Sequence, residues 1–409
     1  MHLLARRARQ PDPGLLAVAA TWYVSGSAQS GVPVGGLGRE GVRFTRTVSS
    51  ADDIAGVTGT VPVAHPIRIF VGLDAAATPE ARVAMAIAEM HRTGAADRRH
   101  LLLISPAGTG YANPTPVQAL ELLSGGDCAS IAVAFGVLPS FLSTSRVPLA
   151  ARTQRLLLAA VAAAVTDRGS RPRLLLYGES LGATAQVRAL PAGLADLDRY
   201  GVTSAVWVGT PGGAERALRR GQVASLGEGR TRSHHRPAEP LAGVVAFDDP
   251  RRSDSSLVAQ PRIWLLEHDD DPVVLLRPDL LWRRPSWLPR AGGRGGELSP
   301  GRRWWPVLTW LWVLRATIAA GRVVPGEFTR RGHDYRADLA RTVATAYRLP
   351  ATAETMARCE RRLRDGERDR AARIAHPQPP GRQAPAQVTA VGTAPAGPPD
   401  RPTSGRRGR

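Results

Sequence analysis

The pentapeptide GESLG at 178–182 matches the pattern G-x-S-x-G, with the serine at position 180. It directly follows an apolar run at 172–177 and precedes an Ala-rich run typical of a helix. A serine raised on a sharp turn between a strand and a helix needs glycine-sized residues two positions before and after it, because side chains there would collide. Gly178 and Gly182 meet that need. The pattern predicts a nucleophilic Ser180 at a helix N-terminus, whose dipole favours the anionic intermediate of acyl transfer; an ordinary Gly-Ser turn is the alternative.

A serine hydroxyl is a strong nucleophile only when a base takes its proton, and a carboxylate must hold that base. The carboxylate is expected at the end of a later strand, where Asp269, Asp270 and Asp271 follow the apolar run IWLLEH. Asp271 is our candidate, because Pro272 ends the strand directly after it. Asp269 and Asp270 are interpreted as members of a solvated loop.

The base is expected in a late loop before a last helix, and His333 in the sequence GHDY has that position. A lone histidine in such a loop is more often structural than catalytic, but the order of His333 after Ser180 and Asp271 favours a catalytic role. The remaining histidines beyond Ser180 fit less well: His234 and His235 in an Arg-rich loop, His268 at a strand end, and His376 in the tail.

An oxyanion hole needs backbone N–H groups from two segments. The first should be that of Leu181, directly after the serine. The second should come from the loop PAGTGY at 106–111, which follows an apolar strand and contains Gly108 and Thr109. A plain glycine-rich loop is the alternative for this segment.

Short apolar runs and helical patterns alternate along the chain, which predicts a mostly parallel sheet covered by helices on both faces. The expected strands lie at 66–74, 100–105, 130–136, 172–177, 204–208 and 261–266. The expected helices lie at 79–92, at 149–166, from about 181, at 304–320 and at 334–347. Segments 212–245 and 288–303 are rich in Gly, Arg and Pro and are expected to be loops.

Composition excludes several classes of enzyme. The 409 residues include no lysine, so a Schiff base, a P-loop lysine and a Ser-Lys dyad are all ruled out. Cys128 and Cys359 are the two cysteines, too few for a disulfide scaffold or a thiolate-rich metal site. The proposed chemistry requires no metal and no cofactor.

The net charge of +19 is concentrated in two segments. Residues 277–331 contain eleven Arg, three acidic residues and six of the nine Trp, and residues 361–409 contain eleven Arg and four acidic residues. Arg with Trp suits the headgroup zone of an anionic membrane, whereas an Arg-rich loop followed by a buried Trp face is the structural alternative. We see no nucleic-acid-binding motif and expect no nucleic acid partner.

These patterns divide the chain into three parts. Residues 1–35 contain a short apolar run, LLAVAATWYV, and are expected to be a signal, a membrane-segment remnant or a linker. Residues 36–350 form the α/β domain, within which 277–331 is expected to be a lid-like insertion. Residues 365–409 lack periodicity and are expected to be disordered.

The chain also resembles an actinobacterial family of membrane-anchored α/β-hydrolase proteins over about 36–348. The resemblance rests on these segments: GLGREGVRF, PIRIFVGLD, EMHRTGAADR, SPAGTGY, ELLSGGD, LPSFLS, LLLYGESLGA, EHDDDPVVLLRPDLLWRRPSWL and GHDY. It implies an α/β-hydrolase fold with a Ser/Asp/His site, joined in the family to an N-terminal bundle of transmembrane helices. That bundle is missing here, so membrane association and a cytoplasmic location both remain open. Cys128, Asp269 and Asp270 depart from the family pattern without touching the expected triad.

We therefore expect a serine hydrolase that cleaves a carboxylic ester, with lipidic esters among the expected substrates, in which Ser180 is the nucleophile, His333 the base and Asp271 the residue that orients the base. Leu181 and the loop with Gly108 and Thr109 would hold the oxyanion. An acyltransferase would use the same residues with an alcohol in place of water. A non-catalytic, Arg-rich module that binds anionic membrane is the alternative from another class.

Overall fold

A twisted seven-stranded sheet forms the centre of the computed structural model, with strand order β1-β3-β2-β4-β5-β7-β6. The first six strands of this order run parallel, and the edge strand β6 pairs antiparallel with β7. The expected α/β-hydrolase-type fold is thus confirmed. The structure describes residues 9–137, 144–169, 171–212, 244–247, 262–268, 270–285, 304–320 and 323–377.

The six parallel strands coincide with the six apolar runs of the sequence, to within a few residues at each end. Together with the antiparallel β6, the seven strands are β1 Ile67–Val71, β2 His100–Ser105, β3 Cys128–Val133, β4 Arg173–Glu179, β5 Val202–Val208, β6 Val244–Phe247 and β7 Ile263–Leu266. Every residue of β1, β2, β3 and β7 is buried. Continuous apolar runs form such strands because helices cover both faces of a parallel sheet.

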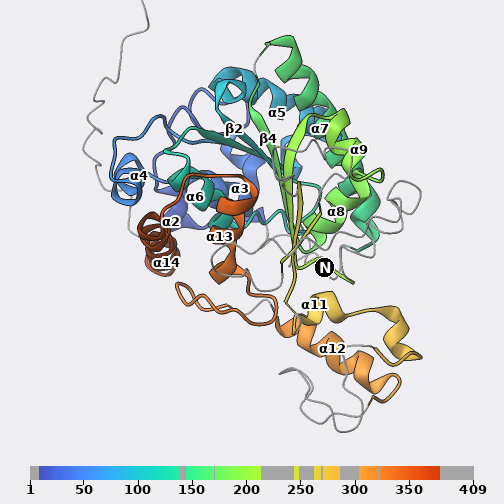
Figure 1. Ribbon diagram of the computed structural model, residues 1–409. Coiled ribbons are helices and arrows are strands. Elements are labelled where there is room, and N and C mark those ends of the chain that lie inside the picture. The colour runs from blue at the N-terminus through green and yellow to red at the C-terminus, as the bar shows by residue number, and fades with distance from the viewer. Residues whose placement is uncertain are drawn as a thin grey trace, which may run out of the picture.

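Helices pack on both faces of the sheet, as Figure 1 shows. The α-helices are α2 Pro13–Leu16, α3 Val34–Thr45, α4 Ala51–Thr58, α5 Pro79–Thr93, α6 Pro114–Leu123, α7 Val147–Asp167, α8 Leu181–Ala189, α9 Leu194–Arg199, α11 Pro272–Leu275, α12 Leu308–Ala319, α13 Arg336–Ala346 and α14 Ala353–Ala375. Helices α5, α7 and α8 pack together on one side, and α6 and α13 on the other, with α4 and α14 outside them. The carboxyl ends of the parallel strands therefore meet at one open edge.

One helix among the described residues, α7, is long and apolar enough to cross a membrane by length and composition alone. It packs against α5 and α8. Leu157, Leu158 and Val161 on its inner face belong to the main hydrophobic core. In this structure α7 is a covering helix of the sheet.

The N-terminal segment packs on the domain ahead of the predicted boundary at residue 36. Val24 forms a β-bridge with Arg68 of β1, and Ser25 donates a hydrogen bond to Glu89 of α5. Within the apolar run at 15–24, all of which the structure describes, Leu15 and Leu16 alone are helical; they belong to the four-residue α2, which contacts α14. Residues 24–32 are therefore part of the folded unit.

The predicted start of the C-terminal tail at residue 365 is wrong, because α14 continues to Ala375. Met356, Cys359 and Leu363 of this helix pack into the core. Their spacing of three and four residues is typical of an amphipathic helix, but the high Arg content of the segment made this pattern hard to recognise in the sequence. Residues 378–409 of the predicted tail lie outside the described residues. The predicted loop at 288–303 and nearly all of the predicted loop at 212–245 also lie outside them.

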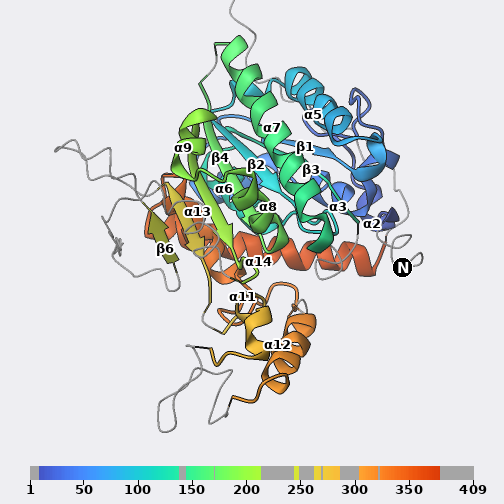
Figure 2. The same ribbon diagram turned by 90° about the vertical axis from the view of Figure 1, so that its right-hand side faces the viewer.

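A small lobe lies beside the carboxyl edge of the sheet, formed by α11, the 3-10 helix Pro278–Leu281 and α12 (Figure 2). Its own apolar cluster consists of Leu275, Leu280 and Val313 with three partly buried neighbours. The Thr317 hydroxyl donates to the Pro272 carbonyl at 3.0 Å and ties α12 to α11. This lobe contains residues 278–281 and 308–319 of the predicted lid-like insertion, whereas the described residues 323–331 lie beyond α12.

Candidate active site

Ser180 lies on the turn between β4 and α8, in a strained backbone conformation. Its φ of 54° and ψ of −122° are rare for a non-glycine residue. A Cβ atom at Gly178 would lie 2.8 Å from Cα of Ala183, and one at Gly182 would lie 2.1 Å from the Ser105 carbonyl oxygen. Both glycines are therefore required by close backbone approach, which is the physical reason for the G-x-S-x-G spacing.

Asp271 and His333 are joined by a short hydrogen bond. Nδ1 of His333 and Oδ2 of Asp271 lie 2.7 Å apart, and the Asp271 side chain is completely buried. The second oxygen, Oδ1, accepts from the Val273 N–H at 2.8 Å, because Asp271 caps α11. A carboxylate held in this way fixes both the tautomer and the orientation of the imidazole.

The surroundings of His333 raise the pKa of its imidazole. Burial lowers the pKa of His333, but the hydrogen bond and charge of Asp271 outweigh that effect, with smaller contributions from Glu179 and Asp334. The pKa of His333 is consequently raised above its usual value of 6.5. An imidazole of this kind accepts a proton readily, as a general base must.

Tyr335 is a third partner in this cluster. Its hydroxyl donates to Oδ2 of Asp271 at 2.6 Å and accepts from the His268 N–H at 3.2 Å. Its ring meets that of His333 edge-on, with centroids 5.6 Å apart. Burial and the charge of Asp271 raise the pKa of Tyr335, so this hydroxyl stays a donor.

The β5 strand connects the serine turn with the histidine. The Ser180 N–H donates to the carbonyl of Val208, the last residue of β5, at 2.8 Å. The next residue, Gly209, lies so close to the imidazole that a Cβ atom there would be 2.7 Å from Cε1 of His333. Ser180, Asp271 and His333 therefore lie at one edge of the sheet, although no hydrogen bond joins Ser180 to His333 among the described residues.

The interpretation of Asp270 as a solvated loop residue is wrong. Its Oδ1 accepts from the N–H of Gly332 at 2.9 Å, and Gly332 has a positive φ of 57°. His268 holds the same glycine from another side, because its Nδ1 lies 3.0 Å from the Gly332 carbonyl oxygen. Both side chains position the backbone that carries His333. Asp269 lies outside the described residues.

The expected oxyanion segments also reach this edge. Within the 106–111 loop, the N–H groups of Ala107 and Gly110 bond inside the loop at 2.8 Å each. The N–H groups of Gly108 and Thr109 bond to none of the described residues, and neither does that of Leu181 at the first position of α8. These three amides therefore have no hydrogen-bond partner among the described residues, as donors to an oxyanion would require.

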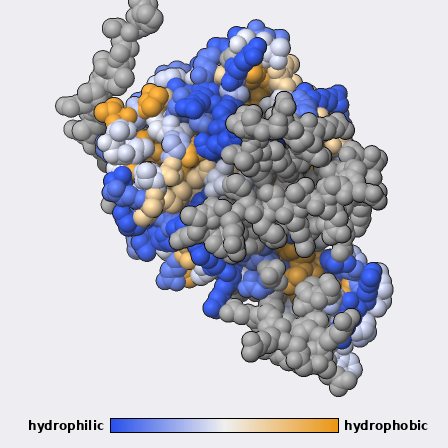
Figure 3. All heavy atoms as spheres, in the orientation of Figure 1, coloured by the Kyte–Doolittle hydropathy of each residue, from blue (hydrophilic) through white to orange (hydrophobic). Residues whose placement is uncertain are grey.

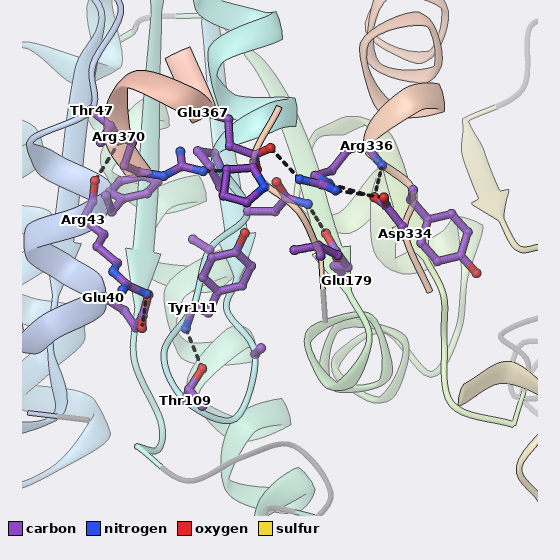
Figure 4. A pocket seen from close by; sticks show the side chains of 18 of the residues that line it. Glu40, Arg43, Thr47, Thr109, Tyr111, Glu179, Asp334, Arg336, Glu367 and Arg370 are labelled. Carbon is purple, nitrogen blue, oxygen red and sulfur yellow. Dashed lines mark hydrogen bonds and ion pairs between the residues drawn. The ribbon is translucent and has the colours of Figure 1, made fainter. Parts of the chain in front are cut away.

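A cavity of about 600 Å³ opens beside this cluster. Figure 4 shows the charged and hydroxyl side chains around it, which come from α3, the 106–111 loop, β4, α13 and α14. His333, Glu179 and Thr109 border it on the side of the candidate triad, and Ala320, Val323 and Pro325 border it beside the lobe. Its volume suits a ligand of moderate size.

The comparisons with known proteins agree with this geometry. A profile described as an alpha/beta-hydrolase family matches residues 67–359, which is most of the chain. The chain belongs to this α/β-hydrolase family. A search of the curated proteins found no match.

Among the described residues of this α/β-hydrolase chain, no group of three or more His, Cys, Asp or Glu side chains is placed to hold a metal ion. Sequence reasoning missed four residues that contact or position the cluster: Gly209, His268, Asp270 and Tyr335. Gly209 and Tyr335 had a usable signal, because one directly follows a strand and the other belongs to the GHDY sequence. The contacts of His268 and Asp270 depend on how two distant segments meet.

Proposed function

We propose that this chain is a serine hydrolase of carboxylic esters, with Ser180 as nucleophile, His333 as general base and Asp271 as its orienting carboxylate. The observation that carries the proposal is the 2.7 Å bond between His333 and a fully buried Asp271, at the sheet edge where Ser180 adopts its strained turn. Backbone strain at a strand end is costly and is typical of a catalytic position.

The reaction proceeds in two steps, acylation of Ser180 and hydrolysis of the acyl-enzyme. The Ser180 oxygen bonds to the ester carbonyl carbon while His333 takes the hydroxyl proton. The bond between the carbonyl carbon and the alcohol oxygen then breaks, and His333 returns the proton to the departing alcohol. Water repeats the sequence on the acyl-enzyme and releases the acid and free Ser180. Leu181, Gly108 and Thr109 N–H groups stabilise the oxyanion in both steps. The bond from Ser180 to His333 forms as substrate closes the site, since such bonds tighten in substrate complexes.

Hydrolysis of p-nitrophenyl butyrate tests this proposal. Wild type should release p-nitrophenol, and Ser180→Ala should lower kcat/KM by about a thousandfold or more. Ser124→Ala is the matched control, because Ser124 caps α6 just before β3, at the opposite edge of the sheet. Equal activity of Ser180→Ala and wild type, with both variants folded by circular dichroism, would overturn the assignment.

A second proposal concerns the outer face of the lobe, which we infer binds an anionic membrane surface. Leu308, Leu311, Arg315 and Ile318 recur every three or four residues on α12, and all four are exposed. Leu308 and Ile318 retain 63% and 60% of their accessible surface. Apolar and hydrophilic surfaces adjoin in this lobe (Figure 3). An apolar stripe with arginine suits the interface of an anionic bilayer.

Vesicle flotation tests the membrane proposal. Wild type should float with phosphatidylcholine vesicles that contain phosphatidylglycerol, less so at high salt, and not with phosphatidylcholine alone. The triple variant Leu308→Ser, Leu311→Ser, Ile318→Ser should lose most of this binding. The control Val61→Ser, Val63→Ser removes equally exposed apolar side chains elsewhere and should keep it. Unchanged binding by the triple variant would contradict the proposal.

A further inference from the structure

Glu179, the residue before the candidate nucleophile, extends into the cavity beside His333 (Figure 4). Its Oε2 accepts from the Asn113 side-chain amide at 2.8 Å and from the Tyr177 hydroxyl at 2.6 Å. Its Oε1 accepts no hydrogen bond from the described residues, and the Glu179 residue is only partly buried. One oxygen is therefore fixed by the protein, and the other belongs to a side chain that lines the cavity and has no partner among the described residues.

The other charges around the cavity neutralise one another. Arg336 uses all five of its N–H donors: they reach the carboxylates of Asp334 and Glu367 and the carbonyl oxygens of Val324 and Glu327. Arg370 donates to the second oxygen of Glu367 at 3.2 Å. Two arginines thus balance two carboxylates on this wall.

The opposite wall is balanced in the same way. Arg43 pairs with Glu40 at 3.2 Å and with Asp12 at 2.7 Å, and Arg39 also contacts Asp12 at 3.4 Å. Glu179, by contrast, pairs with no arginine within the described part of the chain. The cavity consequently carries one uncompensated negative charge, adjacent to the reacting centre.

An aromatic ring accompanies this carboxylate. Tyr111 lines the same cavity as Glu179 (Figure 4), and the residue keeps 36% of its accessible surface. A carboxylate and an aromatic face within one cavity form the usual environment for an organic ammonium group, because both the charge and the ring quadrupole attract a cation.

We propose that Glu179 and Tyr111 bind an ammonium group on the ester substrate, so that the preferred substrates are cationic. This inference rests on the proposed esterase function. It extends that function by naming a substrate class, and it assigns to Glu179 a role in substrate choice.

The test uses two pairs of isosteric esters that differ only in charge. One pair carries the charge on the alcohol, as in butyrylcholine and 3,3-dimethylbutyl butyrate. The other carries it on the acyl group, as in the p-nitrophenyl esters of 4-trimethylammoniobutanoate and 5,5-dimethylhexanoate. In at least one pair, wild type should prefer the cationic ester roughly tenfold in kcat/KM, mainly through KM.

The ratio within a pair isolates charge recognition from general damage to the site. Glu179→Gln keeps an oxygen to accept from Asn113 and should bring the cationic-to-neutral ratio close to one. Tyr111→Leu should lower the ratio as well. Glu40→Gln is the matched control, because it neutralises a cavity carboxylate that is already paired with Arg43, and it should keep the wild-type ratio.

The outcomes separate the two proposals. If neither pair is hydrolysed by wild type, the esterase function itself fails. If both members of each pair react equally, or Glu179→Gln keeps the preference, the esterase function stands and the ammonium site is wrong. A Glu179→Gln variant that changes only the pH profile, without changing the ratio, would also overturn the ammonium site and leave Glu179 as an electrostatic partner of His333.

Discussion

Tyr335 donates its hydroxyl proton to the same oxygen of Asp271 that holds His333. The carboxylate is completely buried, and Oδ2 therefore relies on these two donors in place of water. These two hydrogen bonds restrict the position of the carboxylate. The restricted carboxylate in turn restricts the orientation of the His333 imidazole.

Replacing Tyr335 by Phe removes one donor from a buried carboxylate. We expect a loss of about 1–3 kcal/mol in the free energy of unfolding, together with a roughly tenfold fall in kcat/KM because His333 is less well oriented. Thermal unfolding and ester hydrolysis measure the two effects. Tyr347→Phe is the matched control, since its buried hydroxyl donates to the Leu176 carbonyl at 2.7 Å, away from the cluster. An equal loss of activity in both variants would show that Tyr335 acts through stability alone.

Substituting Gly209 by Ala introduces a methyl group against the rings of His333 and Tyr335. Its Cβ would lie 2.7 Å from both Cε1 of His333 and Cε2 of Tyr335, so the imidazole must move. We expect kcat to fall by about ten- to a hundredfold, as for other small displacements of reacting groups. Gly201→Ala is the control for backbone strain, because Gly201 also has a positive φ, of 67°, but nothing lies within 4 Å of a Cβ atom there. Unaltered kcat in Gly209→Ala would contradict the geometry.

The pH dependence of kcat/KM reports the state of His333 in the free protein. Only neutral His333 can accept the Ser180 proton, so activity should rise as pH passes through a pKa above 6.5 and should level off beyond it. Because the charge of Glu179 contributes to the raised pKa, Glu179→Gln should move this rise to lower pH. Glu40→Gln should leave it in place. A rise centred below 6.5, or one that Glu179→Gln does not move, would be inconsistent with these electrostatics.

Much of this arrangement was predictable from the sequence, for physical reasons. Continuous apolar runs identified the six parallel strands, because only buried strands tolerate such runs. The glycines at 178 and 182 identified the serine turn, because close backbone approach excludes any larger residue there. The meeting of Asp271 and His333 was expected from their order along the chain, and the structure brings the two side chains into contact.

The supporting contacts were not predictable in the same way. Asp270 and His268 look like ordinary polar loop residues, and their roles arise only when the end of β7 meets the loop around Gly332. The edge strand β6 was missed because it lies in a Gly- and Arg-rich stretch that carries no strand pattern except at its end. Long-range contacts of this kind depend on tertiary packing, which local periodicity does not record.

Asp270 should act as a positioning residue for His333. Asp270→Ala removes the acceptor for the Gly332 N–H, and we expect kcat to fall several-fold, because a turn with positive φ loses its anchor. Asp270→Asn keeps an oxygen acceptor and should restore most of the activity. Steady-state kinetics of the two variants shows whether Asp270 acts through its hydrogen bond to the Gly332 N–H or through its negative charge. If Asp270→Asn were as impaired as Asp270→Ala, the charge and not the hydrogen bond would matter.

The central claim is that Ser180 is a nucleophile activated by His333, and mapping the adduct of a fluorophosphonate probe tests it most directly. Cleavage after arginine isolates residues 174–188, in which Ser180 is the sole serine, so fragment masses assign the labelled atom. We predict one phosphonate per wild-type molecule, located on Ser180, and strongly reduced labelling of His333→Ala. An unlabelled but folded wild-type protein, or a phosphonate on any other residue, would contradict the account.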